Sequence, residues 1–210
     1  MNRIRYTLVT DGPSDRLLRF PIDWLLERLT PLDFDGEWAN PAVYGPDRAP
    51  RLVGRLDAAL KWYPCQLLFV HRDAEREPRA VRVNEIEDAM GHLHSPPSAV
   101  CVVPVRMTEA WLLINEDALR EAAGNPNGRA ELSLPAVSTL ESVPDPKNVL
   151  FNLLRSASEL RGRRRRGFRE AGARQRLAEL IDDFSPLERL PAFRSFRTDL
   201  ERVLGEQGWT

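Results

Sequence analysis

Two kinds of apolar pattern alternate along the first half of the chain. Short apolar or β-branched runs, typical of buried strands, lie at residues 4–10 (IRYTLVT), 65–70 (CQLLFV) and 98–105 (SAVCVVPV). Longer segments, with apolar residues at helical spacing, separate these runs. They predict helices at residues 15–29, 51–62, 77–93 and 108–124.

Strands that alternate with helices predict an α/β fold with a mainly parallel central sheet covered by helices on both faces. The run at 65–70 is apolar on both faces, so we expect it in the centre of the sheet. The segment 31–50, rich in Pro, Gly and Asp, is expected to be a loop. The helix at 108–124 should have Thr108 as its N-cap and Gly124 as its stop.

The second half of the chain has a different pattern. A loop rich in Pro and Ser runs to about residue 146, and only helical patterns follow it, at 147–160, 172–183 and 192–205. We therefore expect an α/β domain at 1–145 and a helical extension at 146–210, packed on the same domain. Three tryptophans at helical apolar positions are expected in the core: Trp24, Trp62 and Trp111.

Composition excludes some classes of protein. Apolar residues make up 42% of the chain and charged residues 29%, which argues against wholesale disorder. The net charge of -1 means that any nucleic-acid site must be local. Cys65 and Cys101 lie far apart and are expected to be buried free thiols of a cytoplasmic protein. No apolar run approaches membrane-spanning length, so we expect no membrane association.

Carboxylates follow three of the predicted strands. Asp11 ends the first run and Asp15 comes four residues later, Asp73 and Glu75 follow the central run, and Glu109 follows the third. Ligands of parallel sheets bind at the carboxyl ends of the strands, where these acids should gather. Gathered carboxylates repel one another, and a divalent cation with hard oxygen ligands, Mg²⁺ or Mn²⁺, would relieve that repulsion. The pattern suits phosphodiester hydrolysis.

Each acid also has a local explanation. Asp11 before Gly12 and Pro13 is ordinary turn chemistry. Asp15 is suited to capping its own helix, and Glu109 to the positive end of the helix in which it lies. The coincidence of three strand ends is what favours a site.

Two acidic segments, VTDGPSD (9–15) and HRDAE (71–75), resemble the motifs of the Toprim fold, found in topoisomerases, primases and OLD-type nucleases. The segment VPVRMTEAWLLIN (103–115) resembles a signature of an uncharacterised Toprim-like bacterial family. That family is often encoded beside an ABC-type ATPase in phage-defence loci. Three further segments share its pattern, so that the resemblance covers most of the chain: NPNG, DPK and DFSPLERLPAF.

The resemblance implies roles for the strand-end acids. Asp11 stands where the Toprim motif has its Glu, and Asp15 at the second acid of that motif. Asp73 and Glu75 stand at the Asp-x-Asp pair, and Glu109 at the later acid of the bacterial family. Asp11 for Glu and Glu75 for Asp are departures, and they leave open a protein that keeps the fold and has lost catalysis.

Basic residues supply candidate phosphate contacts. His71 and Arg72 lie beside the acids, and Arg106 precedes Glu109 by three residues, where it could clamp a phosphate or pair with Glu109. His71 is equally suited to a hydrogen bond that only orders the strand end. Lys147, one of two lysines, is a candidate for stabilising charge in the transition state.

The strongest local charge is the arginine-rich segment, residues 161–169 (RGRRRRGFR). It suits contacts with a polynucleotide backbone, although a solvated loop and a contact with an acidic protein surface are alternatives. The expected nucleic-acid contacts within it are Arg161, Arg163, Arg164, Arg165 and Arg166.

The leading hypothesis is a Mg²⁺- or Mn²⁺-dependent nuclease that hydrolyses phosphodiester bonds in DNA or RNA. The resemblance implies that it is the effector of a bacterial anti-phage defence system with an ATPase partner. Asp11, Asp15, Asp73 and Glu75 would hold the metal, with Glu109 as a further ligand or general base. The rival is a non-catalytic Toprim-like subunit that binds the ATPase or nucleic acid. An ion pair between Arg72 or Arg106 and these acids would favour the rival. The sequence leaves the oligomeric state open, a homo-oligomer included.

Overall fold

The computed structural model describes residues 3–43 and 51–210 and divides the chain into two compact units. The sheet unit comprises the residues up to Pro104 together with Ala192–Thr210, and the helical unit comprises Val105–Pro191. This division does not coincide with the expected boundary at residue 145. The last helix belongs to the sheet unit, and residues 105–145 belong to the helical unit.

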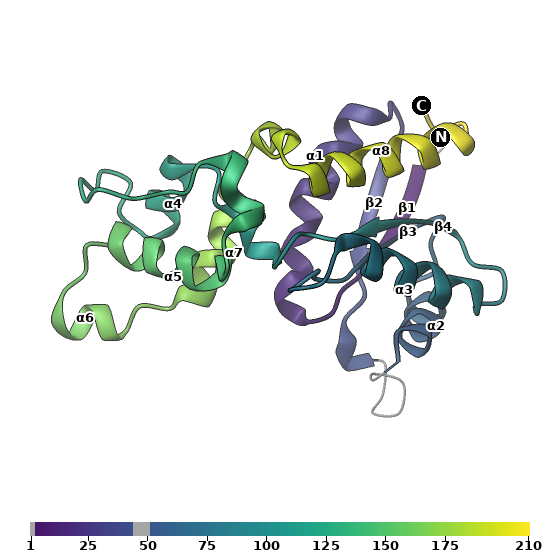
Figure 1. Ribbon diagram of the computed structural model, residues 1–210, viewed down its shortest axis with the longest axis horizontal. Helices are drawn as coiled ribbons and strands as arrows, with labels where there is room; N and C mark the ends of the chain where they lie inside the picture. The colour runs from purple at the N-terminus through teal and green to yellow at the C-terminus, as the bar shows by residue number, and fades with distance from the viewer. Residues whose placement is uncertain (1–2, 44–50) are drawn as a thin grey trace. The chain divides into compact units, whose positions relative to one another are not determined.

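The sheet unit is built on four strands, all parallel, in the order β2-β1-β3-β4 (Figure 1). Their bounds are Arg3–Val9 for β1, Asp33–Trp38 for β2, Leu67–His71 for β3 and Ser98–Val102 for β4. Strand β3 is buried along its whole length, and it lies between β1 and β4, which confirms its predicted central place. The α/β class and the parallel sheet are therefore as predicted.

Strand β2 lies where the sequence predicts a loop, so that prediction is wrong for Asp33–Trp38. The strand is an edge strand whose residues alternate between exposed and half-buried, and its exposed positions carry acids. Gly36 pairs with Tyr6 of β1, and a Cβ on Gly36 would lie 2.1 Å from the Tyr6 ring. Glycine and acids are poor strand formers, which explains why composition hid this strand.

Helices cover both faces of the sheet (Figure 1). They are α1 (Arg19–Leu29) and α8 (Pro191–Glu206) on one face, and α2 (Leu52–Trp62) and α3 (Arg79–Gly91) on the other. Short 3-10 helices at Pro13–Leu18 and Pro41–Val43 complete the unit.

The strand register assigns side chains to these two faces. Val9 pairs with Val70, and both pack in a cluster with Leu56 of α2 and Ile86 of α3. Side chains one residue away along each strand point to the opposite face.

That opposite face is aromatic. Tyr6 meets Phe69 edge to face at 5.2 Å between ring centroids, and Phe69 meets Phe196 of α8 at 6.1 Å. The Tyr6 hydroxyl donates to Asp23 of α1, so both helices are attached to this face. Because Phe196 packs against the central strand, α8 is part of the sheet unit and not of a helical extension.

The helical unit contains four α-helices and three 3-10 helices among its residues, all of which the structure describes. The α-helices are α4 (Glu116–Ala122), α5 (Pro146–Ala157), α6 (Gly162–Arg166) and α7 (Glu170–Leu180). The 3-10 helices are Thr108–Leu112, Val137–Ser142 and Ser185–Arg189. Fully buried leucines on three of the helices form its core: Leu119, Leu150, Leu154 and Leu177.

The single helix predicted at 108–124 is instead two elements. Met107, not Thr108, occupies the N-cap position of the 3-10 helix and makes no side-chain capping bond. A new helix begins after Asn115, whose side-chain oxygen accepts from the Ala118 N–H. The continuous apolar run across this junction concealed the break. Gly124 follows the helix end with a φ of +77°, in the left-handed region expected of a glycine stop.

The environments of three tryptophans and two cysteines agree only in part with those expected from the sequence. Trp24 and Trp111 are buried as predicted, but Trp62 is 64% exposed, so its assignment to the core is wrong. Cys65 and Cys101 are free, and they are half-buried instead of fully buried. Among the residues that the structure describes, no helix is long and apolar enough to span a membrane.

Candidate functional site at the carboxyl edge of the sheet

The turn after β1 positions the first two acids. The Asp15 carboxylate accepts from the backbone N–H of Gly12 at 3.1 Å and from the Ser14 hydroxyl at 3.2 Å. The backbone N–H of Asp15 in turn donates to the Gly12 carbonyl. Asp15 is buried, and its carboxylate serves its own turn, as the local explanation expects. Asp11, at the start of this turn, is exposed.

A buried histidine lies between two of the acids. His71, the last residue of β3, is 1% exposed, and its Nε2 lies 3.1 Å from Asp73 Oδ1. Its other ring nitrogen, Nδ1, lies 4.0 Å from Asp15 Oδ2. The carboxyl end of the central strand therefore holds an acid–imidazole–acid arrangement.

These neighbours shift the pKa values of His71 and Asp15. Burial alone would lower the pKa of His71, but the hydrogen bond and charge of Asp73, with the charges of Asp15 and Asp11, raise it overall. Burial, aided by the charge of Asp73, raises the pKa of Asp15 against the opposing charge of His71. The cluster therefore favours a protonated, positively charged imidazole between the two acids.

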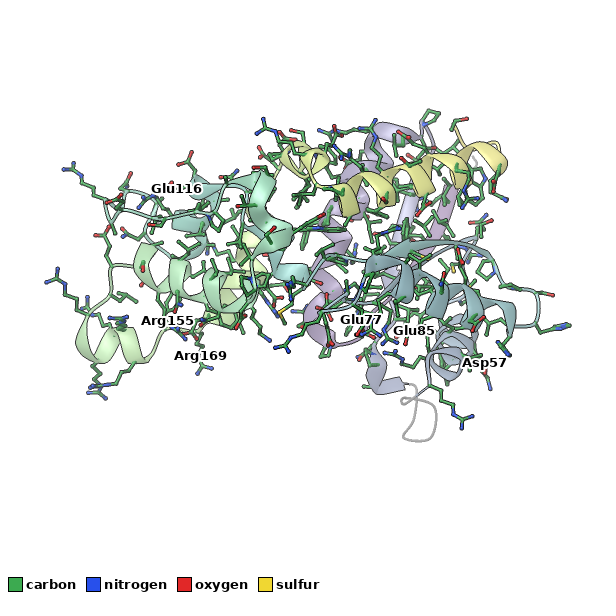
Figure 2. The ribbon with its side chains drawn as sticks, viewed as in Figure 1. Asp57, Glu77, Glu85, Glu116, Arg155 and Arg169 are labelled. Atoms are coloured by element: carbon green, nitrogen blue, oxygen red, sulfur yellow. The ribbon has the colours of Figure 1, made fainter. Side chains whose placement is uncertain are left out.

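Asp11 is held by two arginines of the sheet unit. Both terminal nitrogens of Arg55, on α2, donate to Asp11 Oδ1 at 3.2 Å. The Nε of Arg72 lies 3.1 Å from Asp11 Oδ2, and its Nη2 lies 3.5 Å from Glu85 of α3, which Figure 2 labels. Both carboxylate oxygens of Asp11 thus face a guanidinium group.

Glu75 does not share the surroundings of Asp73. Its φ is +54°, its side chain is 71% exposed, and its nearest charged partner is Arg82 at 3.8 Å. Arg82 also donates to the Asp73 carbonyl and to Glu85, at 3.2 and 2.9 Å. Two residues in the Asp-x-Glu spacing therefore have different environments, one beside a buried imidazole and one at the surface.

The fifth candidate acid, Glu109, lies in the helical unit. Its buried carboxylate accepts from Arg174 Nη1 of α7 at 2.5 Å, and Arg174 is also buried. Arg174 thus takes the partnership that the sequence suggested for Arg106, whose φ is +70°. Lys147 lies half-buried in the first turn of α5, as predicted, after Asp145, whose side chain caps that helix.

The strand-end acids suit a hard cation by their chemistry but not by their placement. Each of Asp11, Asp15, Asp73 and Glu75 has a positively charged or ionisable nitrogen partner within 4.0 Å. Among residues 3–43 and 51–210, no three Asp, Glu, His or Cys side chains form a group that could hold one metal ion. As folded, these residues do not fit the resident Mg²⁺ that the resemblance implies.

The sequence analysis missed the partners that neutralise this edge. Arg55 on α2, with Arg82 and Glu85 on α3, belong to no motif and lie at polar positions of their helices. Only the fold brings them to the strand ends. Arg174, the partner of Glu109, likewise lies 65 residues away in sequence.

The arginine-rich segment lies entirely in the helical unit. Residues 161–166 are all exposed, and α6 presents its arginines to solvent. The predicted contacts Arg161 and Arg163 to Arg166 are therefore accessible to a large anionic ligand. No family model matches the chain, and neither the curated proteins nor the solved structures contain a significant match to it.

Proposed function

We propose that the chain is a Toprim-like subunit that binds nucleic acid, and an ATPase partner, without itself cutting phosphodiester bonds. The observation that carries this proposal is the pairing of Asp11 with Arg55 and Arg72. A carboxylate that ligates a cation must offer its oxygens to it. Both oxygens of Asp11 already lie 3.1–3.2 Å from guanidinium nitrogens.

The charge of the surrounding cluster supports the same reading. The side chains of Arg55 and Arg72 are 11% and 19% exposed, so removing their counter-charge would leave two guanidinium groups poorly solvated. A charged His71 between Asp15 and Asp73 would repel a second cation at that point. The positive side chains therefore occupy the electrostatic role that a metal ion would have.

The binding half of the proposal rests on other residues. The exposed arginines of α6 support nucleic-acid binding, because a dense local positive charge releases counterions from a phosphate backbone. The ATPase partner rests on the resemblance of the acidic motifs and of residues 103–115 alone.

A metal-dependent nuclease is the second candidate, and one observation favours it. Asp11, Asp15 and Asp73 all raise the pKa of the same buried imidazole, so three strand-end carboxylates act on one point. If the chain is such a nuclease, a substrate or partner would have to draw Arg55 and Arg72 away from Asp11 before this edge of the sheet could bind a metal ion.

The first test measures Mn²⁺ binding by electron paramagnetic resonance. We expect the wild type to retain no Mn²⁺ at submillimolar concentrations. The double variant Arg55→Gln/Arg72→Gln should bind at least tenfold more tightly, because it removes two positive charges from Asp11. Arg79→Gln is the matched control, since Arg79 pairs with Asp199 at 3.1 Å elsewhere in the sheet unit. Tight Mn²⁺ binding by the wild type, lost in Asp11→Asn, would contradict the proposal.

The second test measures cleavage of labelled plasmid DNA and total RNA with Mg²⁺, Mn²⁺ or EDTA. We expect no metal-dependent cutting by the wild type. Metal-dependent cutting that disappears in Asp73→Ala would refute the non-catalytic reading and establish the nuclease. Circular dichroism of each variant controls for unfolding.

A further inference from the structure

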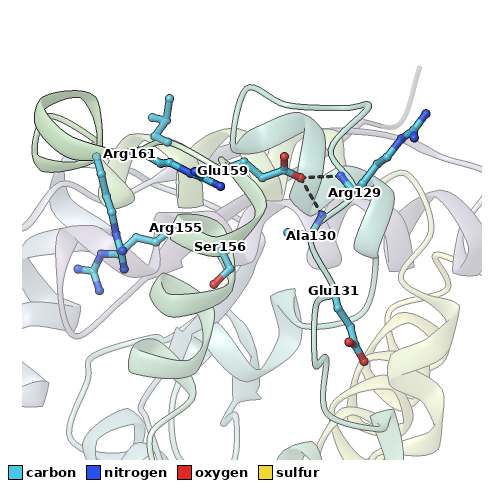
Figure 3. Close-up of a pocket in the computed structure, with 9 residues that line it drawn as sticks. Arg129, Ala130, Glu131, Arg155, Ser156, Glu159 and Arg161 are labelled. Atoms are coloured by element: carbon cyan, nitrogen blue, oxygen red, sulfur yellow. Dashed lines mark hydrogen bonds between the residues drawn. The ribbon is translucent and has the colours of Figure 1, made fainter.

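A pocket of about 570 Å³ lies in the helical unit beside the arginine-rich segment (Figure 3). Its wall is formed by residues 129–131, by the last turn of α5 with the residues that follow it, and by part of α6. Four arginines line it: Arg129, Arg155, Arg161 and Arg165. Arg129 and Arg155 belong to no motif of the sequence.

Much of the positive charge of this pocket is not neutralised. Among the residues that the structure describes, no ion pair involves Arg129, Arg161 or Arg165, whereas Arg155 pairs with Glu170 of α7 at 2.5 Å. The pocket also has two acids in its wall, Glu131 and Glu159. In Figure 3 the side chains of Arg129 and Glu131 point away from Glu159.

The wall of the pocket is held in place by hydrogen bonds. Glu159 accepts from the backbone N–H groups of Arg129 and Ala130, at 2.5 and 2.7 Å, and these bonds lower its pKa. Arg120 donates to the carbonyls of Gly128 and Ala130, at 3.0 and 2.8 Å. The carboxylate of Glu159 is thus engaged mainly with backbone and only to a lesser degree with the charge of Arg161, so that Arg129, Arg161 and Arg165 remain without an ion pair in a preformed pocket.

The absence of a side chain at Gly128 allows the NPNG segment (residues 125–128) to lie close to the end of α5. A Cβ at this position would lie 2.5 Å from the side chain of Asn125 and 3.0 Å from Glu159. Asn125 itself donates to the Ala157 carbonyl at the end of α5. The NPNG segment therefore holds the adjoining wall residues 129–131 against the end of α5 and contributes no charge to the pocket.

We propose that this pocket receives one nucleotide of a single-stranded nucleic acid, with its phosphate bound by Arg161 and Arg165. This inference rests on the nucleic-acid binding proposed above and names where that binding is specific. Guanidinium groups match the geometry of phosphate oxygens, and the volume lies in the range of small-molecule sites. Leu160 adds an apolar patch for a sugar or base.

Single strands suit a recessed pocket better than duplexes or acidic proteins do. A nucleotide in a duplex is stacked and paired, so that entering a pocket would cost its unstacking. A flat acidic protein face would meet the outward arginines of α6, such as Arg163 and Arg164, which do not line the pocket.

The experiment uses fluorescence anisotropy of a labelled 15-nucleotide single strand at fixed salt. It compares Arg161→Ala/Arg165→Ala with Arg163→Ala/Arg164→Ala, two double variants with the same change in net charge. All four arginines are exposed, so both variants should fold. We expect at least a tenfold loss of affinity for the pocket variant and a twofold to threefold loss for the control. A duplex and poly-glutamate serve as competitors.

Three other outcomes would each refute the pocket or the function proposed for it. Equal losses in the two variants would mean that bulk charge binds the strand, which refutes the pocket but keeps the proposed function. Competition by poly-glutamate as strong as that by the single strand would assign the pocket to an acidic protein. No binding of any nucleic acid by the wild type would refute the nucleic-acid half of the proposed function together with the pocket.

Discussion

The replacement of Glu109 by Gln tests whether this acid is structural. Glu109 is 3% exposed, and its partner Arg174 is 9% exposed, so the pair is largely removed from water. Glutamine keeps the shape of the side chain and removes its charge. The guanidinium of Arg174 would then be buried without a counter-charge, and we expect the helical unit to be strongly destabilised.

The magnitude follows from the geometry of the pair. At an N–O distance of 2.5 Å and an effective dielectric constant of about 20, the Coulomb energy is about 7 kcal/mol. Desolvation of both groups offsets much of it, and removing one partner of a buried pair costs about 3–5 kcal/mol. In terms of local opening, this corresponds to roughly two to four orders of magnitude in amide protection.

Hydrogen exchange of the amides of α7 is the appropriate assay, because a chain of two units need not unfold in one step. Arg176→Gln is the matched control, since Arg176 lies on the same helix and pairs with Glu121 at 3.8 Å at the surface. For this control we expect the free energy of local opening of α7 to fall by less than about 1 kcal/mol. The apolar double variant Glu109→Leu/Arg174→Met should regain wild-type protection or exceed it.

One result would refute this reasoning. If Glu109→Gln left the protection of α7 within a factor of about five of the wild type, below the cost of any buried unpaired charge, the pair would not be structural. Should the same variant also abolish metal-dependent cutting by an active wild type, Glu109 would belong to catalysis, as the resemblance implies.

Two further predictions concern the buried histidine and two glycines, one in each unit. His71 has a raised pKa in the folded state, so its contribution to stability is complete below its unfolded pKa of 6.5 and is lost as the pH rises through the folded value. Asp15, also raised, has the same sign at more acidic pH. The urea concentration at the unfolding midpoint should therefore decrease as the pH rises above 6.5. In His71→Gln the midpoint should depend less on pH, and an unchanged pH dependence in this variant would contradict the assignment. Gly36→Ala should destabilise the protein by about 1–3 kcal/mol, because its Cβ meets the Tyr6 ring at 2.1 Å. Gly172→Ala, in α7 with nothing within 4 Å, should instead stabilise it by about 0.5–1 kcal/mol, and equal thermal shifts for the two variants would refute the steric argument.

Most of the strands and helices could be predicted because their signals are local. The apolar or β-branched runs of β1, β3 and β4 and the helical spacing of α5 and α8 depend only on neighbouring residues. Strand β2 could not, since Asp33, Gly36 and Glu37 form a strand only because β1 offers an edge to pair with. The place of α8 was hidden for a similar reason, because Phe196 packs on a residue more than a hundred positions away.

For the candidate site too, local sequence determined some features and tertiary packing determined others. The sequence determined that Asp11, Asp15, Asp73 and Glu75 follow strands of a parallel sheet, because strand direction places every such residue at one edge.

What those acids contact was decided only by the tertiary structure. Arg55 reaches Asp11 across 44 residues of sequence, and His71 meets Asp15 across 56, because α2 and β3 pack beside β1. The ionisation of a carboxylate and its capacity to ligate a cation depend on charges within a few ångströms. Proximity of that kind is a property of packing, and no local pattern encodes it.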